Sequence, residues 1–296
     1  MIPVGRTSRV AGVCGFRLQG MARIDASTHD EDLVRVYGPA TWQVYDELDI
    51  SLNPRGPDWL HDLAADLIPA NGNVIDAGCR DAAHLVQLMR AHPSARGFGI
   101  DPVPLHVEKA QSLVVENGLQ DRVEVMLSDI ESAATTGKQF DFVWCRDVLE
   151  QVADLQTAAR ALASLTRPTG TLLVFTTVAT DLLSPDEAAM LKRHLANVPA
   201  NLSRSAVEDA FPAAGLDVIQ CHEIGTEWRE WAEERHAPAS TALLRLARLR
   251  RDRARLDALH GSDIVDHVEA NLHWEIYQFI GKLASLVYVL RPTATR

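Results

Sequence analysis

The sequence predicts a doubly wound α/β fold with a mostly parallel, seven-stranded sheet. Between residues 71 and 178, five short apolar runs of strand length alternate with helical segments or longer loops, a pattern typical of a parallel sheet with helices on both faces. Two further strand candidates follow towards the C-terminus. A chain of 296 residues, 47% hydrophobic and 23% charged, is long enough to bury such a core. We therefore expect one large α/β domain with helical additions.

The first part of the chain is expected to lie outside the sheet. Residues 1–24 contain several glycines and arginines and show little periodicity. They do not resemble a signal peptide, and we expect either a disordered tail or sequence upstream of a true start at Met21. Leucine and aromatic residues recur at helical spacing over 31–48 and 56–68, which predicts two helices. Residues 25–70 are therefore expected to form a helical lead-in to the sheet.

Residues 71–225 are expected to form the core of the sheet. Buried strands are indicated by apolar runs bounded by turn residues, and the last two helices each open with a serine, which is typical of a helix start. The expected strands span residues 73–78, 96–101, 122–129, 140–145, 171–178 and 215–224, and the expected helices span 82–91, 103–117, 153–166, 184–196 and 203–214.

The final strand, within residues 284–296, is separated from the strand before it by a long segment, residues 226–283. Helical spacing predicts three helices in that segment, over 226–236, 239–259 and 262–282. We expect the segment to be a cap that closes over a substrate. Oligomerisation or simple packing is the other explanation for it.

The cap carries two charged clusters. Six arginines lie within residues 245–255 of an otherwise acidic chain. They could bind a phosphorylated or carboxylated substrate, pair with a second subunit in a homodimer, or form a solvated helix face. Acidic and histidine residues lie on neighbouring turns between Asp263 and His273. Because they do not complete a metal ligand set, we expect an exposed charged face there and no metal site.

Charge and cysteine content limit the partners that the sequence predicts. The formal net charge of -11 disfavours binding to nucleic acid and to anionic membranes. The four cysteines lie far apart and form no C-x-x-C pair, so neither a disulfide framework nor a zinc knuckle is expected. No apolar run approaches the length that a membrane span needs. We expect a cytoplasmic protein with a small-molecule substrate.

Five short motifs occur in a characteristic order along residues 71–178: VIDAGC, GIDP, SDIE, FDFVWCRDVLEQVADL and LTRPTGTLLVFTT. In this order and spacing the chain resembles the class I S-adenosylmethionine-dependent methyltransferases, in their small-molecule type with a helical insertion before the last strand. The resemblance implies S-adenosylmethionine as the cofactor. It covers the central part of the chain.

The resemblance also implies which residues bind the cofactor. It puts Asp76 and Gly78 beside the methionyl part and Asp101 at the ribose hydroxyls. It puts Asp129 and Ile130 at the adenine. A carboxylate with two acceptor oxygens suits a vicinal diol, and a loop that opens a helix offers N–H donors to a carboxylate. We also expect Cys79, Arg80, Pro102 and Arg146 at the cofactor site.

The loop after the first strand departs from the nucleotide-binding pattern at two positions. Arg80 and Ala82 stand where such a loop normally carries glycine, which disfavours a dinucleotide oxidoreductase, whose loop needs three glycines to approach a pyrophosphate. An arginine at position 80 means that the loop either takes an ordinary conformation or uses the side chain. The side chain is expected to bind the cofactor's carboxylate, or to face outward and pair with Asp81 or another surface acid.

Methyl transfer requires in-line positioning of an acceptor, and a base when the acceptor is an alcohol, an acid or a carbon acid. We expect that base among Glu150 after the fourth strand, Asp181 after the fifth and His273 in the cap. Gln151 stands where many small-molecule members carry a histidine, which disfavours a histidine-based mechanism from that loop. Further candidates are Asp147 and His267.

The sequence thus predicts a methyltransferase that acts on a small organic molecule such as a specialised metabolite. The alternative is a methyltransferase-like binding or partner protein without catalytic activity, because two loop positions are altered and the usual histidine is replaced by Gln151. Neither interpretation includes a nucleic-acid partner or a membrane anchor.

Overall fold

A computed structural model of the chain describes residues 26–294 and divides the chain into two compact units, residues 1–52 and 53–296. The tail predicted over residues 1–24 lies outside the described residues. The boundary between the two units falls inside the segment predicted as a helical lead-in over 25–70. The helix predicted over 56–68 is α3 (Pro57–Leu67), which belongs to the larger unit.

The first unit contains two helices, α1 (Ala26–Val36) and α2 (Pro39–Leu48). The sequence predicted one helix over residues 31–48, and that prediction is wrong. Pro39 has no N–H group, so it begins a helix readily but interrupts one that would run through it. Gly38 sits at the break, where a Cβ would lie only 2.5 Å from a backbone oxygen of α1.

The second unit is built on one seven-stranded sheet in the order β3-β2-β1-β4-β5-β7-β6. All neighbouring strands are parallel except β7, which is antiparallel to both of its neighbours. The winding reverses between β1 and β4, which confirms the predicted doubly wound fold. The strands are β1 (Asn73–Ala77), β2 (Arg96–Asp101), β3 (Val123–Leu127), β4 (Phe140–Arg146), β5 (Thr166–Ala179), β6 (Leu216–Gly225) and β7 (Leu283–Pro292).

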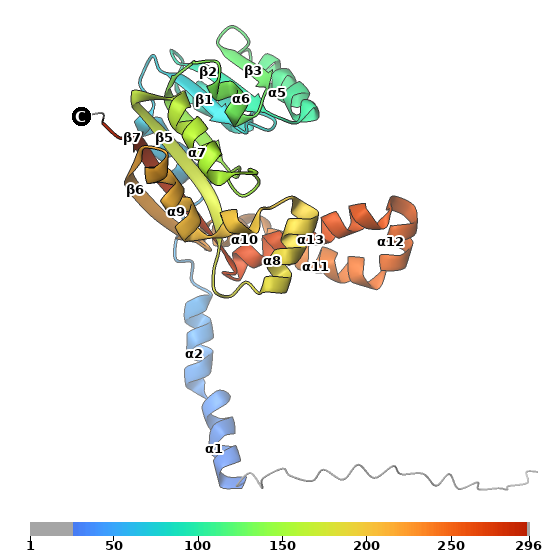
Figure 1. Ribbon diagram of the computed structural model, residues 1–296. Coiled ribbons are helices and arrows are strands. Elements are labelled where there is room, and N and C mark those ends of the chain that lie inside the picture. Colours follow the sequence, from blue (N-terminus) through green and yellow to red (C-terminus); the bar gives the residue numbers. More distant parts are fainter. Residues whose placement is uncertain (1–25, 295–296) are drawn as a thin grey trace, which may run out of the picture. The chain divides into compact units, whose positions relative to one another are not determined.

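Helices cover both faces of this sheet (Figure 1). Alternate residues of β4 pack on opposite faces of the sheet, because successive side chains of a strand point to opposite sides. Phe142 and Trp144 pack with α3, α4 and α5, whereas Val143 and Cys145 pack with α6, α7 and α9. None of the described helices is long and apolar enough to cross a membrane. The bounds are α4 (Ala83–Ala91), α5 (Pro104–Glu116), α6 (Ile130–Ala134), α7 (Leu155–Leu165) and α9 (Arg204–Ala213).

Helix α6 and the start of strand β5 differ from the prediction. Helix α6 was not predicted, because a helix of 5 residues is too short to show helical periodicity. Strand β5 begins at Thr166, earlier than predicted, although Pro168 and Gly170 are typical of a turn. The register between β4 and β5 shifts between Phe140 and Phe142, and a shift of this kind accommodates an irregular stretch within a continuing strand.

Four helices lie between β6 and β7, where the sequence predicted three. The helix predicted over 239–259 is interrupted at Asp252, which has non-helical backbone angles and donates its N–H to the last carbonyls of α11. The four helices are α10 (Glu227–His236), α11 (Pro238–Arg251), α12 (Arg253–His260) and α13 (Ser262–Phe279).

These four helices lie at the carboxyl edge of the parallel strands. Because β7 is antiparallel to both β5 and β6, β5 and β6 run in the same direction. The cap therefore leaves the sheet and returns to it at the edge where β5 ends. Figure 1 shows α13 beside α8 (Pro185–Leu195), which follows β5. Ligands of open α/β sheets bind at this edge.

Three of the six arginines in the cluster, Arg250, Arg253 and Arg255, form ion pairs with acidic residues of the cap. Arg253 bonds Asp257 at 2.8 Å, Asp266 at 2.5 Å and Glu269 at 3.1 Å. Arg250 also contacts Glu269, at 3.3 Å. Asp266 and Glu269 of the second cluster are therefore partners of two of the arginines, and these residues form a charged surface on the cap helices.

Candidate functional site

The loop that joins β1 to α4, residues 78–82, follows the strand at which the winding of the sheet reverses. The N–H groups of Gly78 and Cys79 both donate to the carbonyl of Ile100 at 2.9 Å. Gly78 has φ +86, and a Cβ there would clash with Val148 in the turn after β4. The glycine is therefore required by the fold itself. The Cys79 thiol is buried, and burial raises its pKa.

Arg80 and Ala82 both have left-handed backbones, with φ 51 and φ 60. The loop thus keeps the conformation that favours glycine without having glycine, which costs roughly 1–2 kcal/mol per residue. The ordinary conformation considered for Arg80 from the sequence is absent. Asp147, in the turn after β4, also has a positive φ, of 54. Strained residues of this kind cluster at ligand-binding sites.

The Arg80 side chain is exposed and makes no ion pair with any described residue. Pairing with Asp81, one of the two alternatives drawn from the sequence, is therefore not observed. Asp81 instead accepts a long hydrogen bond, 3.4 Å, from the backbone N–H of Ala83 at the start of α4. The guanidinium of Arg80 is left available at the mouth of the loop.

Asp101 ends β2 and is 5% exposed. Its Oδ2 accepts the backbone N–H of Arg80 at 2.9 Å, and its Oδ1 accepts that of Val103 at 2.9 Å. His106 Nδ1 lies 3.0 Å from the same Oδ1. The carboxylate therefore ties the loop after β1 to the start of α5, and of its roughly four acceptor positions one remains. The adjacent Pro102 is exposed.

Asp129 is the N-cap of α6, because its Oδ1 accepts the backbone N–H of Ser132 at 2.6 Å. Hydrogen bonding to Ser132 holds the pKa of Asp129 below its usual range. Ile130 begins the helix and is buried at 4% exposure. The two residues implied at the adenine thus also fix the start of α6.

Asp76 lies in β1 and is 3% exposed, and its carboxyl makes no hydrogen bond with any described residue. Burial raises the pKa of Asp76 to about 7, against the opposing charge of Arg146. A buried carboxyl without a donor is costly. The position is therefore suited to a ligand that brings a cationic or hydrogen-bond donor group.

Arg146 ends β4 and connects four elements of the site. Its Nε donates to Asp147 at 3.1 Å and its Nη1 to His84 Nε2 at 2.6 Å. The guanidinium also lies 5.3 Å from the ring of Phe175 on β5 and 5.2 Å from that of Trp228 on α10. Arginine over aromatic rings gains a cation–π attraction. The cap and the strands thus meet at this side chain.

Glu150 lies inside the protein, at 3% exposure. Its Oε1 accepts the Thr176 hydroxyl at 2.8 Å and also the backbone N–H of Thr177. Its Oε2 is buried without a partner among the described residues. Burial, with Asp147 as a smaller cause, raises the pKa of Glu150 to about 7. Glu150 is therefore a carboxyl that holds its proton close to neutral pH.

Asp181 and His273 lie in different places from Glu150. Asp181 is exposed in the loop between β5 and α8. His273 is on α13, where its Nδ1 lies 2.8 Å from the carbonyl of Glu269 and its Nε2 lies 3.1 Å from Arg250. No hydrogen bond among the described residues joins any two of the three base candidates, so the structure does not bring them together.

His273 lines an open groove of about 360 Å³ between α8 and α13. Its walls carry acidic, histidine and tyrosine side chains, and one of the acids, Glu187, is paired with Lys282. The groove lies at the carboxyl edge of the sheet. Its lining residues are Asp186, Glu187, Met190, His194, Asp266, Glu269, Ala270, His273 and Tyr277.

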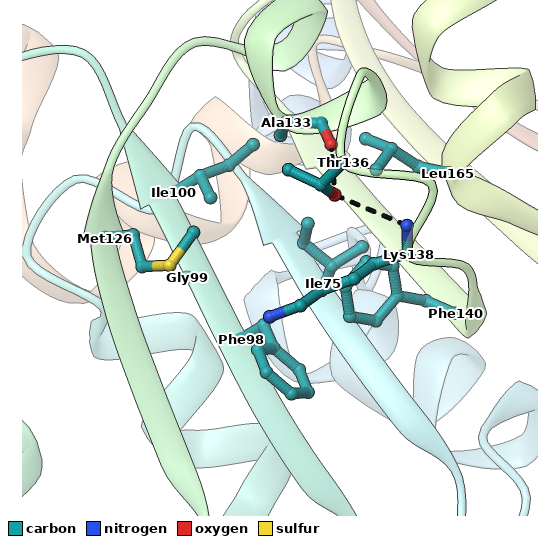
Figure 2. Close-up of a pocket in the computed structure, with 10 residues that line it drawn as sticks. All are labelled: Ile75, Phe98, Gly99, Ile100, Met126, Ala133, Thr136, Lys138, Phe140 and Leu165. Carbon is teal, nitrogen blue, oxygen red and sulfur yellow. Dashed lines mark hydrogen bonds between the residues drawn. The ribbon is translucent and has the colours of Figure 1, made fainter.

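A second cavity, of about 20 Å³, is apolar and lies between the sheet and the turn after α6 (Figure 2). Phe98 and Phe140, which make an edge-to-face contact, wall it together with Ile75, and Thr136 bonds the Lys138 backbone beside it. It has room for about one water-sized group. A void this small and apolar is a gap in the packing and not a ligand site.

Gln151, at the position where many small-molecule members have a histidine, donates its side-chain amide to the carbonyl of Leu195 at 3.2 Å. It therefore closes the C-terminal end of α8. Sequence reasoning missed His61 and His84, which lie beside Arg146. The only sequence feature that could have indicated either residue is the position of His61, a polar residue that lies with Leu60 and Ala64 on the buried face of α3.

Comparison with known proteins gives a family match. The chain matches a family described as a methyltransferase domain over residues 48–221. The ubiquinone biosynthesis O-methyltransferase of Aeromonas salmonicida (strain A449) is similar, being 30% identical over 125 residues, or 42% of this chain and 50% of that protein. The chain thus spans about half the length of this curated relative.

Two solved structures share the fold. An S-adenosylmethionine-dependent methyltransferase from Geobacter sulfurreducens, in complex with S-adenosylhomocysteine, is similar with a TM-score of 0.55 and 22% identity, covering 86% of this chain and 98% of that one. The [4+2]-cyclase SpnF is similar with a TM-score of 0.60 and 18% identity, covering 80% and 81%. At these identities the similarity establishes the fold alone.

Proposed function

The chain belongs to the methyltransferase-domain family of class I, S-adenosylmethionine-dependent proteins, and we propose that it transfers a methyl group from S-adenosylmethionine to a small organic molecule. One observation carries the proposal. Asp76, Asp101 and Asp129 lie in or directly after three neighbouring strands at the edge where the sheet reverses its winding, and Asp101 is bonded to the loop between them.

The residues at this edge fit the cofactor. Its methionyl end carries an ammonium and a carboxylate, which suit the unpartnered carboxyl of Asp76 and the guanidinium groups of Arg80 and Arg146. Asp101 keeps an acceptor position for a ribose hydroxyl. The backbone N–H of Ile130, in the first turn of α6, has no partner within that helix and suits the adenine edge.

When bound, S-adenosylmethionine supplies a methyl group on a sulfonium leaving group. The tasks of the chain are then to orient the acceptor, to exclude water and to take up a proton where the acceptor has one to lose. Asp76 and Arg146 would fix the end of the cofactor next to the sulfonium. The left-handed loop at Arg80 and Ala82 holds the backbone in place before any ligand arrives.

We propose that the cap lines the acceptor site. Trp228 of α10 packs 5.1 Å from Phe175, which belongs to β5, and over the guanidinium of Arg146. Aromatic side chains beside a few polar groups suit a small organic molecule. A specialised metabolite is the acceptor class we favour, because the cap adds an elaborate substrate side to the family's core.

Three residues are proposed as the base. Glu150 has a pKa of about 7, which suits proton uptake near neutral pH, but it is enclosed. Asp181 and His273 are accessible from the carboxyl edge, the first in a loop and the second in the groove beside α8. The pH profile of methyl transfer in Glu150→Gln, Asp181→Asn and His273→Gln variants distinguishes them, since only loss of the base removes its limb of the profile.

The alternative function is that of a methyltransferase-like binding protein without catalysis. It is favoured by Gln151, which stands where many small-molecule members carry a histidine. The side chain of Gln151 donates a hydrogen bond to the carbonyl of Leu195 at the end of α8. The fold by itself does not decide the chemistry, since the [4+2]-cyclase SpnF shares it.

Calorimetric titration followed by a labelled-methyl screen tests the proposal. We expect S-adenosylmethionine to bind, and label to pass to an acceptor in a pool of small metabolites. Asp76→Asn should weaken binding, whereas the control Asp121→Asn, at an exposed aspartate far from the edge, should not. Absence of binding in the wild type would overturn the proposal. Binding without transfer to any acceptor would favour the alternative.

A further inference from the structure

Two histidines and an arginine form a hydrogen-bonded network next to the loop of residues 78–82. Arg146 Nη1 lies 2.6 Å from His84 Nε2, and His84 Nδ1 lies 3.1 Å from His61 Nε2. His84 is in the first turn of α4, directly after the loop, and His61 is on the buried face of α3. The His61 ring stacks on Trp144 with a centroid distance of 5.4 Å. This hydrogen-bonded network therefore connects β4 with α3 and α4.

The distances select one arrangement of donors and acceptors. Arg146 has donors and no acceptor, and its Nη1 lies 2.6 Å from His84 Nε2 but 3.4 Å from His84 Nδ1, so Nε2 is the unprotonated nitrogen that accepts. His84 is then protonated on Nδ1 and donates to Nε2 of His61. His61 carries its own proton on Nδ1, which is buried without a partner among the described residues. Both rings are neutral in this arrangement.

The surroundings favour the neutral rings. Burial, and then the charge of Arg146, lower the pKa of His84 to about 3. The same two causes lower the pKa of His61, against the opposing charges of Asp58 and Asp62 on α3. A doubly protonated His84 would turn an N–H towards the guanidinium and break the hydrogen-bonded network.

The contacts of Arg146 leave part of its guanidinium free. Of the five N–H donors of an arginine, one donates to Asp147 and one to His84, so three remain. The side chain is 17% exposed and lies between the rings of Phe175 and Trp228. The remaining donors are thus held at the carboxyl edge in a fixed orientation, near Asp76.

We propose that His84, supported by His61, is a positioning residue that orients Arg146 to receive the carboxylate of the cofactor's methionyl end. The inference rests on the proposed function and names a role within that same site. Arg146 is the largely buried part of the anion site, and Arg80 is its exposed part. Orientation by an acceptor on a second residue is the usual means of holding a binding group to within a fraction of an ångström.

Binding of two nucleosides by matched variants tests the proposal. S-adenosylhomocysteine carries the carboxylate, whereas 5′-methylthioadenosine has the same adenosine and a thioether without it. His84→Gln retains an acceptor near the place of Nε2, and His84→Leu removes it. His92→Leu, at the far end of α4, is the control for loss of a histidine.

We expect His84→Leu to weaken binding of S-adenosylhomocysteine about tenfold or more, and of 5′-methylthioadenosine by less than about threefold. His84→Gln and His92→Leu should stay within about threefold of the wild type for both. Equal losses for the two nucleosides in His84→Leu would overturn the proposal, because the effect would not depend on the carboxylate. An equal loss in His84→Gln and His84→Leu would overturn it too.

Nitrogen-15 spectra of the histidine rings provide a second readout that needs no ligand. We expect His84 and His61 to be protonated on Nδ1, assigned by the signals that disappear in His84→Gln and His61→Phe. Protonation of His84 on Nε2 would overturn the positioning role even if the variants fold poorly. If the wild type binds neither nucleoside, the proposed function fails and so does the carboxylate role, while the spectra still decide whether His84 holds Arg146.

Discussion

Asp101 Oδ2 accepts the backbone N–H of Arg80 at 2.9 Å, so the end of β2 holds the loop after β1 at a residue with φ 51. The hydrogen bond joins the candidate ribose ligand to the strained part of the candidate methionyl site. A change at either residue is therefore expected to affect both the loop and the ligand.

Asp101→Asn tests this link. The amide leaves one acceptor oxygen and places an NH₂ group against either Arg80 or Val103, whose N–H groups both need an acceptor. We expect affinity for S-adenosylhomocysteine to fall by about 1–3 kcal/mol and the melting temperature to fall as well. Calorimetric titration and thermal unfolding measure the two effects. His106→Ala, which removes only the side-chain partner, is the control and should change affinity less.

Ala82→Gly is expected to leave stability nearly unchanged. Ala82 has φ 60, where glycine relieves about 1–2 kcal/mol of strain, but the change also removes a fully buried methyl group worth about 0.8 kcal/mol and raises the entropy of the unfolded chain, so the free energy of unfolding should stay within about 0.5 kcal/mol of the wild type. Urea denaturation measures it. Gln87→Gly, at an exposed position inside α4, should instead lose about 1 kcal/mol. A loss at Ala82 larger than that at Gln87 would show that the left-handed backbone at Ala82 carries no strain.

Arg80→Ala tests the exposed part of the anion site. Because the guanidinium has no ion-pair partner among the described residues, its removal should leave folding unchanged. Affinity for S-adenosylmethionine should fall about tenfold, or near 1.4 kcal/mol. The loss should be smaller for a decarboxylated analogue of the cofactor. Equal affinities in variant and wild type would make Arg80 a surface residue without a binding role.

Glu150 should make stability depend on pH. Its carboxyl titrates near 4.5 when unfolded and at about 7 in the folded protein, so between these values the folded state binds more protons. The free energy of unfolding then falls as pH rises through this window, by at most about 1.4 kcal/mol per pH unit. Glu150→Gln removes this dependence, because the amide does not titrate.

Urea denaturation of Glu150→Gln and of the wild type, at about pH 5 and about pH 8, measures the effect. The variant should gain stability relative to the wild type as the pH rises. A difference between the two proteins that stays constant over this range would contradict the raised pKa. Asp181→Asn, at an exposed carboxyl, is the control and should show no such trend.

The sequence by itself determined the fold class and most of the elements, because apolar periodicity is a local property that a strand or helix shows within its own residues. It also predicted Asp76, Asp101 and Asp129 as candidate cofactor ligands, since each belongs to a motif at the end of a strand. Short or irregular elements escaped it. The prediction of one helix over 31–48 did not take Pro39 into account. The start of β5 has the sequence of a turn, and only its pairing with β4 makes it part of the strand.

Only the tertiary structure decided how the candidate site is assembled. Arg80 keeps a left-handed backbone because Asp101, 21 residues further along the chain, accepts its N–H. His61, His84 and Arg146 meet because α3, α4 and β4 pack side by side. Contacts between distant segments leave no periodic trace in either segment, since they depend on the packing of the whole sheet. Local pattern therefore specified the elements, and packing specified which side chains face one another.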